Sequence, residues 1–325
     1  MNARESIELL QRRMNEAIIG QEHVVDRLIL GLLADGNILV EGLPGLAKTQ
    51  SIKAMARSVE SKFSRIQFTP DLMPSEVMGS ERIYEEDGKR SYRFYQGAIF
   101  GNIILADEVN RAPARVQSAM LEAMEERQVT VAGKTYKLPE LFIIMATQNP
   151  IEQDGTFPLS DAQKDRFLMH VQIDYVDMES EFKMMKRAEE QRYKKEEKQT
   201  KIPQELIFEA RKEASKVVLS DALGHYIVEL VYATRYPLRY SHQLEVMIDL
   251  GVSPRATLAL SHCAQVHAWM KGRDKVSVED IHSIIHDVFR HRITLTEHAL
   301  SNNRTNDEIV DLILKQVKIP KKVTI

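Results

Sequence analysis

The sequence feature that most constrains the fold is an apolar run, a glycine-containing loop and a helix-forming segment in direct succession over residues 37–59. Residues 37–41 read NILVE, a compact apolar run typical of a buried strand. The residues that follow, GLPGLAKT, are similar to the phosphate-binding pattern G-x-x-x-x-G-K-[ST], except that Ala47 replaces the second glycine. Residues 48–59 favour a helix, so this stretch predicts a phosphate site between a strand and a helix.

The composition is that of a soluble globular chain with room for two domains. Of the 325 residues, 43% are apolar and 28% are charged, and the formal net charge is -3. No apolar run approaches the ~20 residues of a membrane span, and the N-terminus lacks a signal-peptide core, so we expect a cytoplasmic protein. Cys263 is the only cysteine, which favours a buried apolar role over a disulfide or thiolate metal site. The charge balance argues against broad nucleic-acid binding.

Apolar runs alternate with helical patterns through the first half of the chain. Helices are expected at residues 4–17, 21–34 and 114–126, and strands at residues 63–68, 101–106 and 141–147. Buried strands that alternate with helices predict a parallel sheet covered on both faces, which is an α/β fold.

Two stretches interrupt this alternation, and a different pattern follows them. Residues 71–98 and 128–138 each carry two alternating runs about a turn, which predicts hairpins, with plain surface loops as the alternative. Residues 179–204 mix charges of both signs, which favours a solvated helix and linker. Residues 205–325 carry helical patterns and predict an all-α second domain.

The candidate phosphate-binding residues are Gly42, Gly45, Lys48 and Thr49. Glycines let backbone N–H groups turn toward phosphate oxygens at the positive end of the following helix. Lys48 would reach the terminal phosphates, and the Thr49 hydroxyl would ligate Mg²⁺. Ala47 lies at the junction of loop and helix, where helical dihedral angles suit alanine.

Polar residues follow two of the expected strands. A hydrolytic phosphate site needs an acid that fixes the magnesium shell and a base that orients the attacking water. Asp107 and Glu108 fit these two roles, and the alternative is a buried strand that ends in two solvated acids. Asn149 is the candidate for positioning water beside the γ-phosphate, and the alternative is a turn residue before a proline.

Five segments together resemble the MoxR family of AAA+ ATPases, in the helix-2-insert clade. They are GLPGLAKT (42–49), FTPDLMPSEVMG (68–79), LADEVNRAPARVQSAMLEAMEERQVT (105–130), ATQNPIEQDGTFPLSDAQKDRF (146–167) and GVSPRATLAL (251–260). The resemblance implies a P-loop core at residues 1–177, with a parallel five-stranded sheet of order 5-1-4-3-2, and a linker with an all-α lid at 178–325. It also implies a helix-2 insert at about 71–98 and a pre-sensor hairpin at about 128–138. Alanine is usual in the phosphate loop of the family, whereas residues 96–100 (QGAIF) lack the proline that relatives usually carry there.

The resemblance also implies roles for individual residues, with ATP and Mg²⁺ as ligands. Arg166 resembles the finger that reaches into a neighbouring subunit's site, and Arg255 resembles the lid sensor that touches the γ-phosphate of its own subunit's ATP. The candidate catalytic residues are therefore Glu108, Asn149, Arg166 and Arg255, and Thr49 and Asp107 are the candidate metal ligands. The candidate nucleotide contacts are Ile19, Gly20, Gly42, Pro44, Gly45, Leu46, Ala47, Lys48, Thr49, Gln50 and Arg255.

The function that the resemblance implies is Mg-dependent ATP hydrolysis by a homo-oligomeric, hexameric ring that remodels a client protein. Chaperone-like maturation or metal-cofactor insertion, with a von Willebrand factor A domain partner, would be typical of such a protein. The cations Arg127, Lys134 and Lys137 near the second hairpin suggest a nucleic-acid motor as an alternative. A non-catalytic nucleotide-gated scaffold is a third hypothesis, but it predicts the loss of a chemical residue and all of them are present.

Overall fold

The chain forms two compact units, which we describe separately. The computed structural model describes residues 1–325 except 44, 47, 87–88, 150–155, 192–198 and 321–325. The core unit comprises Met1–Ile29, Asn37–Leu159 and Val171–Leu206. The lid unit comprises Leu30–Gly36, Ser160–His170 and Ile207–Ile325. The short segment Ser160–His170 therefore packs with the lid, although core residues precede and follow it in the sequence.

The core is built on a five-stranded sheet with the order β2-β5-β8-β1-β9. When these strands are numbered one to five along the chain, the order reads 5-1-4-3-2 from the other edge, as predicted. The pairings of β2 with β5, β5 with β8 and β8 with β1 are all parallel. The strands are β1 (Ile38–Gly42), β2 (Phe63–Gln67), β5 (Ile103–Asp107), β8 (Ile143–Gln148) and β9 (Met169–Ile173).

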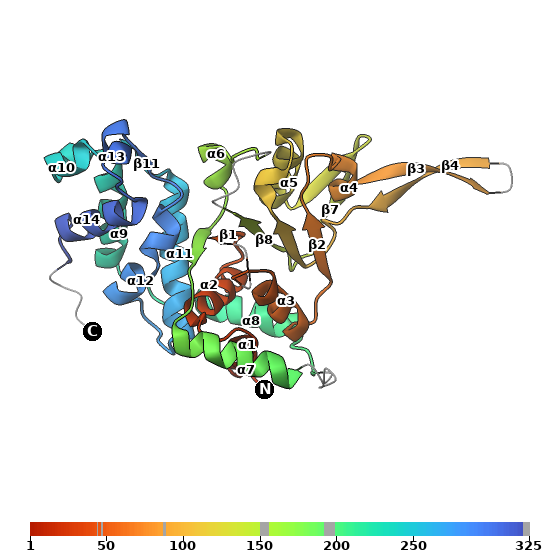
Figure 1. The fold of residues 1–325 in the computed structure, drawn as a ribbon, viewed down its shortest axis with the longest axis horizontal. Coiled ribbons are helices and arrows are strands. Elements are labelled where there is room, and N and C mark those ends of the chain that lie inside the picture. The colour runs from red at the N-terminus through yellow and green to blue at the C-terminus, as the bar shows by residue number, and fades with distance from the viewer. Residues whose placement is uncertain (44, 47, 87–88, 150–155, 192–198, 321–325) are drawn as a thin grey trace. The chain divides into compact units, whose positions relative to one another are not determined.

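Helices cover both faces of this sheet, as the continuous apolar strands require. All five residues of β5 and the first five of β8 are buried. Helix α3 (Lys48–Ser58) joins β1 to β2, and α5 (Ala114–Glu126) lies on the connection that returns from β5 to β8. These two connections run in opposite directions along the sheet, so right-handed crossovers place α3 and α5 on opposite faces (Figure 1). The predicted N-terminal helices are α1 (Ala3–Ala17) and α2 (Glu22–Leu33).

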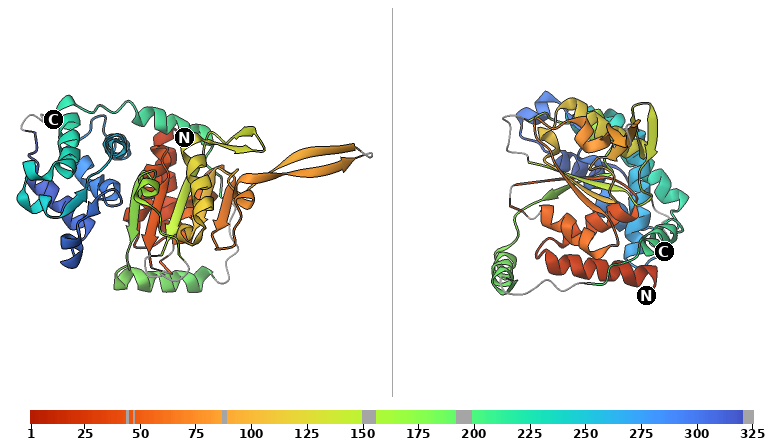
Figure 2. Two further views of the ribbon diagram at one scale, coloured as in Figure 1. Left: turned by 90° about the horizontal axis from the view of Figure 1, so that it is seen from above. Right: turned by 90° about the vertical axis from the view of Figure 1, so that its right-hand side faces the viewer.

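Both predicted hairpins are present in the core unit. Helix α4 (Pro74–Met78) leads into β3 (Gly79–Glu86) and β4 (Lys89–Gln96), an antiparallel ribbon that extends away from the sheet (Figures 1 and 2). The second hairpin is β6 (Gln128–Val131) with β7 (Lys134–Lys137). The Phe94 and Tyr136 rings stack with centroids 3.9 Å apart, and Lys134 Nζ lies 3.1 Å from Glu81 Oε1. These contacts join the two hairpins.

The lid is helical, as predicted, apart from one small ribbon. Strands β10 (Ile248–Leu250) and β11 (Thr294–Leu295) pair antiparallel, which corrects the all-α prediction. Strands of two or three residues are too short to show alternation in the sequence. Beyond β9, α7 (Met178–Gln191) still belongs to the core unit, and α8 (Gln204–Ala214) begins in the core unit and ends in the lid unit. The lid helices that follow are α9 (Asp221–Arg235), α10 (His242–Glu245), α11 (Pro254–Met270), α12 (Val278–Phe289), α13 (Glu297–Ser301) and α14 (Asn306–Gln316).

Two expectations from composition can be compared with the fold. Cys263 is fully buried in α11, as predicted for an apolar role. Within the described ranges, no helix combines the length and the apolar character needed to cross a bilayer.

A buried carboxylate organises the start of α12 in the lid. Asp280 is fully buried, and its Oδ1 lies 2.6 Å from His267 Nδ1 while Oδ2 lies 2.7 Å from Arg273 Nη1. The Ser277 N–H donates to Oδ2 at 2.7 Å, so Asp280 and Ser277 form a capping box. Burial would raise the pKa of Asp280, but hydrogen bonds from His267, Arg273 and Ser277 outweigh it and hold that pKa well below 3.8.

The Asp280 cluster should stabilise the lid in a pH-dependent way. A carboxylate whose folded-state pKa is depressed contributes stability above its unfolded pKa and loses it as the pH falls through the folded value. Asp280→Asn should therefore lower the free energy of unfolding by about 2–4 kcal/mol at pH 7. The difference from the wild type should narrow as the pH falls below about 4. Urea unfolding at pH 7 and pH 3 measures this.

Asp274→Asn is the matched control for Asp280→Asn, because Asp274 is an exposed carboxylate only six positions earlier. It should leave the unfolding free energy unchanged within about 0.5 kcal/mol. An Asp280→Asn deficit of equal size at both pH values would contradict the assignment.

Candidate functional site

The loop between β1 and α3 contains two glycines whose backbone the structure describes. Gly45 adopts a φ of +87°, and a Cβ added there would have open space around it. Gly42 ends β1 where a Cβ would come within 2.7 Å of the Ile173 carbonyl oxygen, so the neighbouring strand β9 requires a glycine. The loop residues Pro44 and Ala47 lie outside the described residues.

Lys48 begins α3 and lies between two strand ends. Its Nζ donates to the Gly42 carbonyl oxygen and, at 3.2 Å, to that of Gln148. The Lys48 ammonium group is thus held at the carboxyl ends of β1 and β8. Thr49 follows in the first helical turn and is half-buried, as is Leu46, whereas Gln50 is exposed.

The turn between α1 and α2 contains Ile19 and Gly20. Gly20 has a φ of +75°, and a Cβ there would come within 2.7 Å of Ser180 Cβ in α7. Glycine is therefore required by the backbone and by this close approach. Ile19 is half-buried. The part that either residue plays toward a nucleotide stays a prediction.

Asp107 ends β5 with its carboxylate held from both neighbouring strands. The Thr147 hydroxyl of β8 donates to Oδ1 at 2.7 Å, and Arg65 of β2 donates to Oδ2 through Nη2 at 2.6 Å and Nε at 3.2 Å. The Asp107 side chain is 11% exposed and that of Arg65 is 45% exposed. The carboxylate is therefore fixed in place at the carboxyl edge of the sheet.

Glu108 has an unusual backbone conformation where the chain leaves β5. Its φ of 59° and ψ of 50° lie in the left-handed region, which non-glycine residues rarely adopt. The Glu108 N–H donates to Thr147 Oγ1 at 3.0 Å, so one hydroxyl supports both acids. Gln67 Nε2 donates to Glu108 Oε2 at 3.1 Å, and Arg111 Nη1 lies 3.3 Å from the same oxygen. Neighbouring residues thus define the position of this carboxylate.

Asn149 follows β8, which lies between β1, the strand before the candidate phosphate loop, and β5, the strand that ends in the two acids, as predicted. It is buried, with 7% of its surface exposed. The preceding Gln148 donates its side-chain amide to Glu41 Oε2. The structure therefore brings the phosphate loop, the two acids and this amide to one edge of the sheet.

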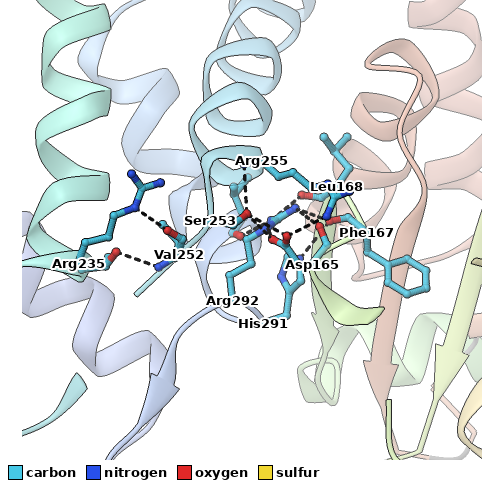
Figure 3. A network of polar contacts seen from close by, with 11 residues as sticks. Asp165, Phe167, Leu168, Arg235, Val252, Ser253, Arg255, His291 and Arg292 are labelled. Carbon is cyan, nitrogen blue, oxygen red and sulfur yellow. Dashed lines mark hydrogen bonds and ion pairs between the residues drawn. The ribbon is translucent and has the colours of Figure 1, made fainter. Parts of the chain in front are cut away.

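The two predicted arginines, Arg166 and Arg255, both belong to the lid unit. Figure 3 shows Arg255 close to Asp165. Arg166 is exposed and follows α6 (Asp161–Lys164). Arg255 lies in the first turn of α11, and its Nη1 is 3.4 Å from Asp165 Oδ2. Both arginines are thus close to Asp165: Arg166 follows it in the sequence, and Arg255 contacts its carboxylate.

Three side chains of this arrangement were not predicted from the sequence. Arg65 and Gln67 lie two residues apart on β2 and so share one face of the strand, from which they contact Asp107 and Glu108. The third residue, Thr147, is a polar residue near the end of the apolar strand β8. The signals were the period-two spacing in FSRIQ and the single hydroxyl in the run IIMAT. Neither signal predicts which residue these side chains contact, because that depends on which strands are paired.

The donors at the sheet edge fit a magnesium ion bound together with phosphates. Within the described part of the chain, no group of three or more His, Cys, Asp or Glu side chains could hold a metal ion. Mg²⁺ commonly takes one or two carboxylates, with waters and substrate phosphates as its other ligands. Asp107 and the Thr49 hydroxyl are oxygen donors of this kind, so the residues present suit that mode.

Family models match both units of the chain. The model described as "ATPase family associated with various cellular activities (AAA)" matches residues 37–169. A model described as "AAA lid domain" matches residues 243–313.

Similar proteins cover nearly the whole chain. "Chaperone MoxR1" of Mycobacterium tuberculosis is 40% identical over 305 residues, which span 94% of this chain and 80% of that protein. "Protein MoxR" of Paracoccus denitrificans is 31% identical, with 87% of each chain covered. A crystal structure from Cytophaga hutchinsonii superimposes with a TM-score of 0.89 at 40% identity, and covers 98% of this chain and 96% of its own.

The shared hydroxyl of Thr147 should be important for the stability of the sheet edge. Thr147→Val keeps the shape of the side chain but leaves the part-buried Glu108 N–H without its acceptor and Asp107 with one donor fewer. The free energy of unfolding should fall by about 1–3 kcal/mol. Thr147→Ser retains the hydroxyl and should lose less than half as much. Urea unfolding of the three proteins measures this, and equal losses in both variants would point to packing instead of the hydroxyl.

Proposed function

Because the chain belongs to the MoxR family of AAA+ ATPases, we propose that it hydrolyses ATP with Mg²⁺ and uses the reaction to remodel a client protein. The observation that carries this proposal is the edge of the sheet. There the phosphate loop, Asp107, Glu108 and Asn149 meet on three adjacent strands or directly after them. This is the set of groups that phosphoryl transfer to water requires.

Each residue at the edge has a distinct part in the proposed reaction. The loop from Gly42 to Gln50 and Lys48 bind the phosphates of the substrate, and Thr49 and Asp107 would hold the magnesium ion. Bound Mg²⁺ would supply neutralisation of phosphate charge. Glu108 accepts the proton of the attacking water, and Asn149 orients that water. Ile19 and Gly20 are proposed to contact the nucleotide.

The two lid arginines are proposed to make hydrolysis depend on assembly. Arg166 acts on ATP bound by the neighbouring subunit, and Arg255 acts on ATP bound by its own subunit. A cation beside the developing charge of the transition state commonly contributes a factor of ~10³ or more to the rate. A finger of this kind requires a homo-oligomer, and we propose a hexameric ring in the cytoplasm.

The joined hairpins support a role in client remodelling. Ile83 and Tyr92 form a cross-strand pair on the β3–β4 ribbon with 62% and 69% of their surfaces exposed. Exposed apolar and aromatic residues on a projecting element suit contact with another protein. The relative "Chaperone MoxR1" supports chaperone-like maturation as the class of work. Metal-cofactor insertion with a von Willebrand factor A domain partner is the more specific form of this proposal.

The alternative of a nucleic-acid motor receives less support from the second hairpin. Arg127 donates to the Phe142 carbonyl oxygen and lies over the Phe142 ring, 5.1 Å from its centroid. Lys134 pairs with Glu81. Two of the three cations that suggested nucleic acid are thus engaged within the protein. DNA-stimulated, salt-dependent hydrolysis would favour the alternative.

Glu108→Gln should separate ATP binding from ATP turnover. The amide keeps the size of the side chain but cannot accept the proton, so hydrolysis should fall by ~10²–10⁴-fold while ATP binding persists. Steady-state phosphate release and equilibrium binding measure the two quantities. Glu122→Gln changes an exposed acid on α5 and should affect neither. Unchanged hydrolysis in Glu108→Gln would remove Glu108 from the role of base.

Arg166→Ala should be inactive alone but regain activity in mixed assemblies. Glu108→Gln subunits retain a normal Arg166 and can complete the sites of Arg166→Ala neighbours, whose own Glu108 is intact. Phosphate release from a mixture should therefore exceed the sum of the separate proteins. Arg304→Ala, at an exposed arginine, is the control and should remain active alone. Absence of recovery in the mixture would contradict action between subunits.

A further inference from the structure

One carboxylate in the lid unit accepts hydrogen bonds from three side chains, which belong to two segments of the chain. Asp165 accepts from Ser253 Oγ at 2.9 Å on both oxygens and from Arg292 Nε at 2.9 Å on Oδ1 (Figure 3). Arg255 Nη1 donates to Oδ2 at 3.4 Å. The donors come from the start of α11 and from the segment after α12. Asp165 therefore ties the segment before β9 to both of them.

Arg292 holds the same segment through its main chain. Its side chain is 2% exposed, and its Nη2 donates to the carbonyl oxygens of Asp165 at 3.2 Å and Phe167 at 2.5 Å. The Arg292 Nη1 donates to the carbonyl oxygen of Leu168 at 3.2 Å and to the carbonyl oxygen of Val288, near the end of α12. Burial lowers the pKa of Arg292, and the charge of Asp165 opposes that shift. The planar fork of an arginine can reach this many acceptors at once, which a lysine cannot.

The contacts on Asp165 reach Arg255 by two routes. Arg255 meets the carboxylate directly, and its N–H donates to Ser253 Oγ at 3.2 Å, so the same serine caps α11 and binds Asp165. Arg166 is the next residue in the chain after Asp165. The backbone of the proposed finger and the first turn that carries the proposed sensor are thus fixed to one ion pair.

We infer that Asp165 and Arg292 are positioning residues that couple the finger Arg166 to the sensor Arg255. The inference rests on the proposed functions of those two arginines. Because the backbone beside Arg166 and the first turn that carries Arg255 are both fixed to this network, a backbone shift at one arginine acts on the other. The network would link the occupancy of a subunit's own site to the action of its finger on the neighbouring subunit.

A purely structural role for the pair makes a different prediction. Any buried arginine of the lid would then affect activity only as far as it affects stability. Arg290 provides the comparison, because its side chain is also largely covered, with 11% exposed against 2% for Arg292. It donates to the His170 carbonyl oxygen, but its acid partners are Asp287 and Asp307. Arg290→Lys is therefore the control for Arg292→Lys.

The experiment compares Asp165→Asn, Arg292→Lys and Arg290→Lys with Arg166→Ala in the full chain. Three quantities are measured: the melting temperature, the affinity for a non-hydrolysable ATP analogue, and ATP hydrolysis alone and mixed with Glu108→Gln subunits. Asp165→Asn and Arg292→Lys should weaken analogue binding by about tenfold through Arg255 and lower hydrolysis by ~10–100-fold. Arg166→Ala should lower hydrolysis without weakening analogue binding. Arg290→Lys should change analogue binding and hydrolysis by less than about threefold, although it lowers the melting temperature as much as Arg292→Lys does.

Ser253→Ala gives a milder second variant if Asp165→Asn does not fold. It removes the hydroxyl that bridges Asp165 and α11 but leaves the pair of Asp165 with Arg292. Ser220→Ala removes the equivalent cap from α9 and is its control. Ser253→Ala should weaken analogue binding and hydrolysis together, by a factor between those of Arg290→Lys and Asp165→Asn.

The results distinguish this inference from the function on which it rests. If Arg292→Lys and Arg290→Lys lower binding and hydrolysis equally, the inference is overturned. If Asp165→Asn behaves like Arg166→Ala, with normal analogue binding and full recovery in the mixture, coupling to Arg255 is overturned. If Arg166→Ala alone remains active, the proposed finger itself fails. Loss of analogue binding and incomplete recovery in the mixture, together with normal Arg290→Lys, support the coupling.

Discussion

The parallel pairing of β5 with β8 is the constraint on which the rest of the site depends. Their register places Ala106 opposite Ala146, so Asp107 and Thr147 lie side by side where the strands end. A slip of one residue would turn the Thr147 hydroxyl to the other face of the sheet and remove the donor of Asp107 and the acceptor of the Glu108 N–H. The apolar residues of both strands are buried on both faces of the sheet, so the apolar pattern alone does not distinguish this register from a slipped one.

Features that depend on local pattern could be predicted from the sequence. The loop between β1 and α3, four of the five strands of the core sheet and both hairpins follow from periodicity and turn residues within short windows, whereas β9 was not predicted in this way. Asp107 and Glu108 could be named because they end an apolar run. Arg65 and Thr147 could not, because each meets Asp107 across about 40 residues of chain and only the pairing of strands brings them together. The positions of Arg166 and Arg255 in the sequence also did not predict a role for either residue. Their proposed roles came from the family resemblance.

The position of the Ser160–His170 segment shows the same limit at the level of domains. Its sequence lies between two core strands, yet it packs with the lid. The reason is Arg292, which lies 127 residues after Asp165 and donates to the carbonyl oxygens of the segment. No local pattern marks Arg292 for this role, since an isolated arginine after a helix usually remains in solvent. Its burial is explained only when the acceptors that surround it are known.

Strand β2 shows how the chemistry and the projecting hairpin are connected through the core. Arg65 and Gln67 of β2 contact Asp107 and Glu108, respectively, so one strand helps to orient both acids. The chain leaves β2 for α4 and then the β3–β4 ribbon, which stacks on the second hairpin through Phe94 and Tyr136. The second hairpin in turn leads to β8 and its Thr147. The side chains that hold the two acids thus lie on the two strands that connect directly to the hairpins, β2 before the first and β8 after the second.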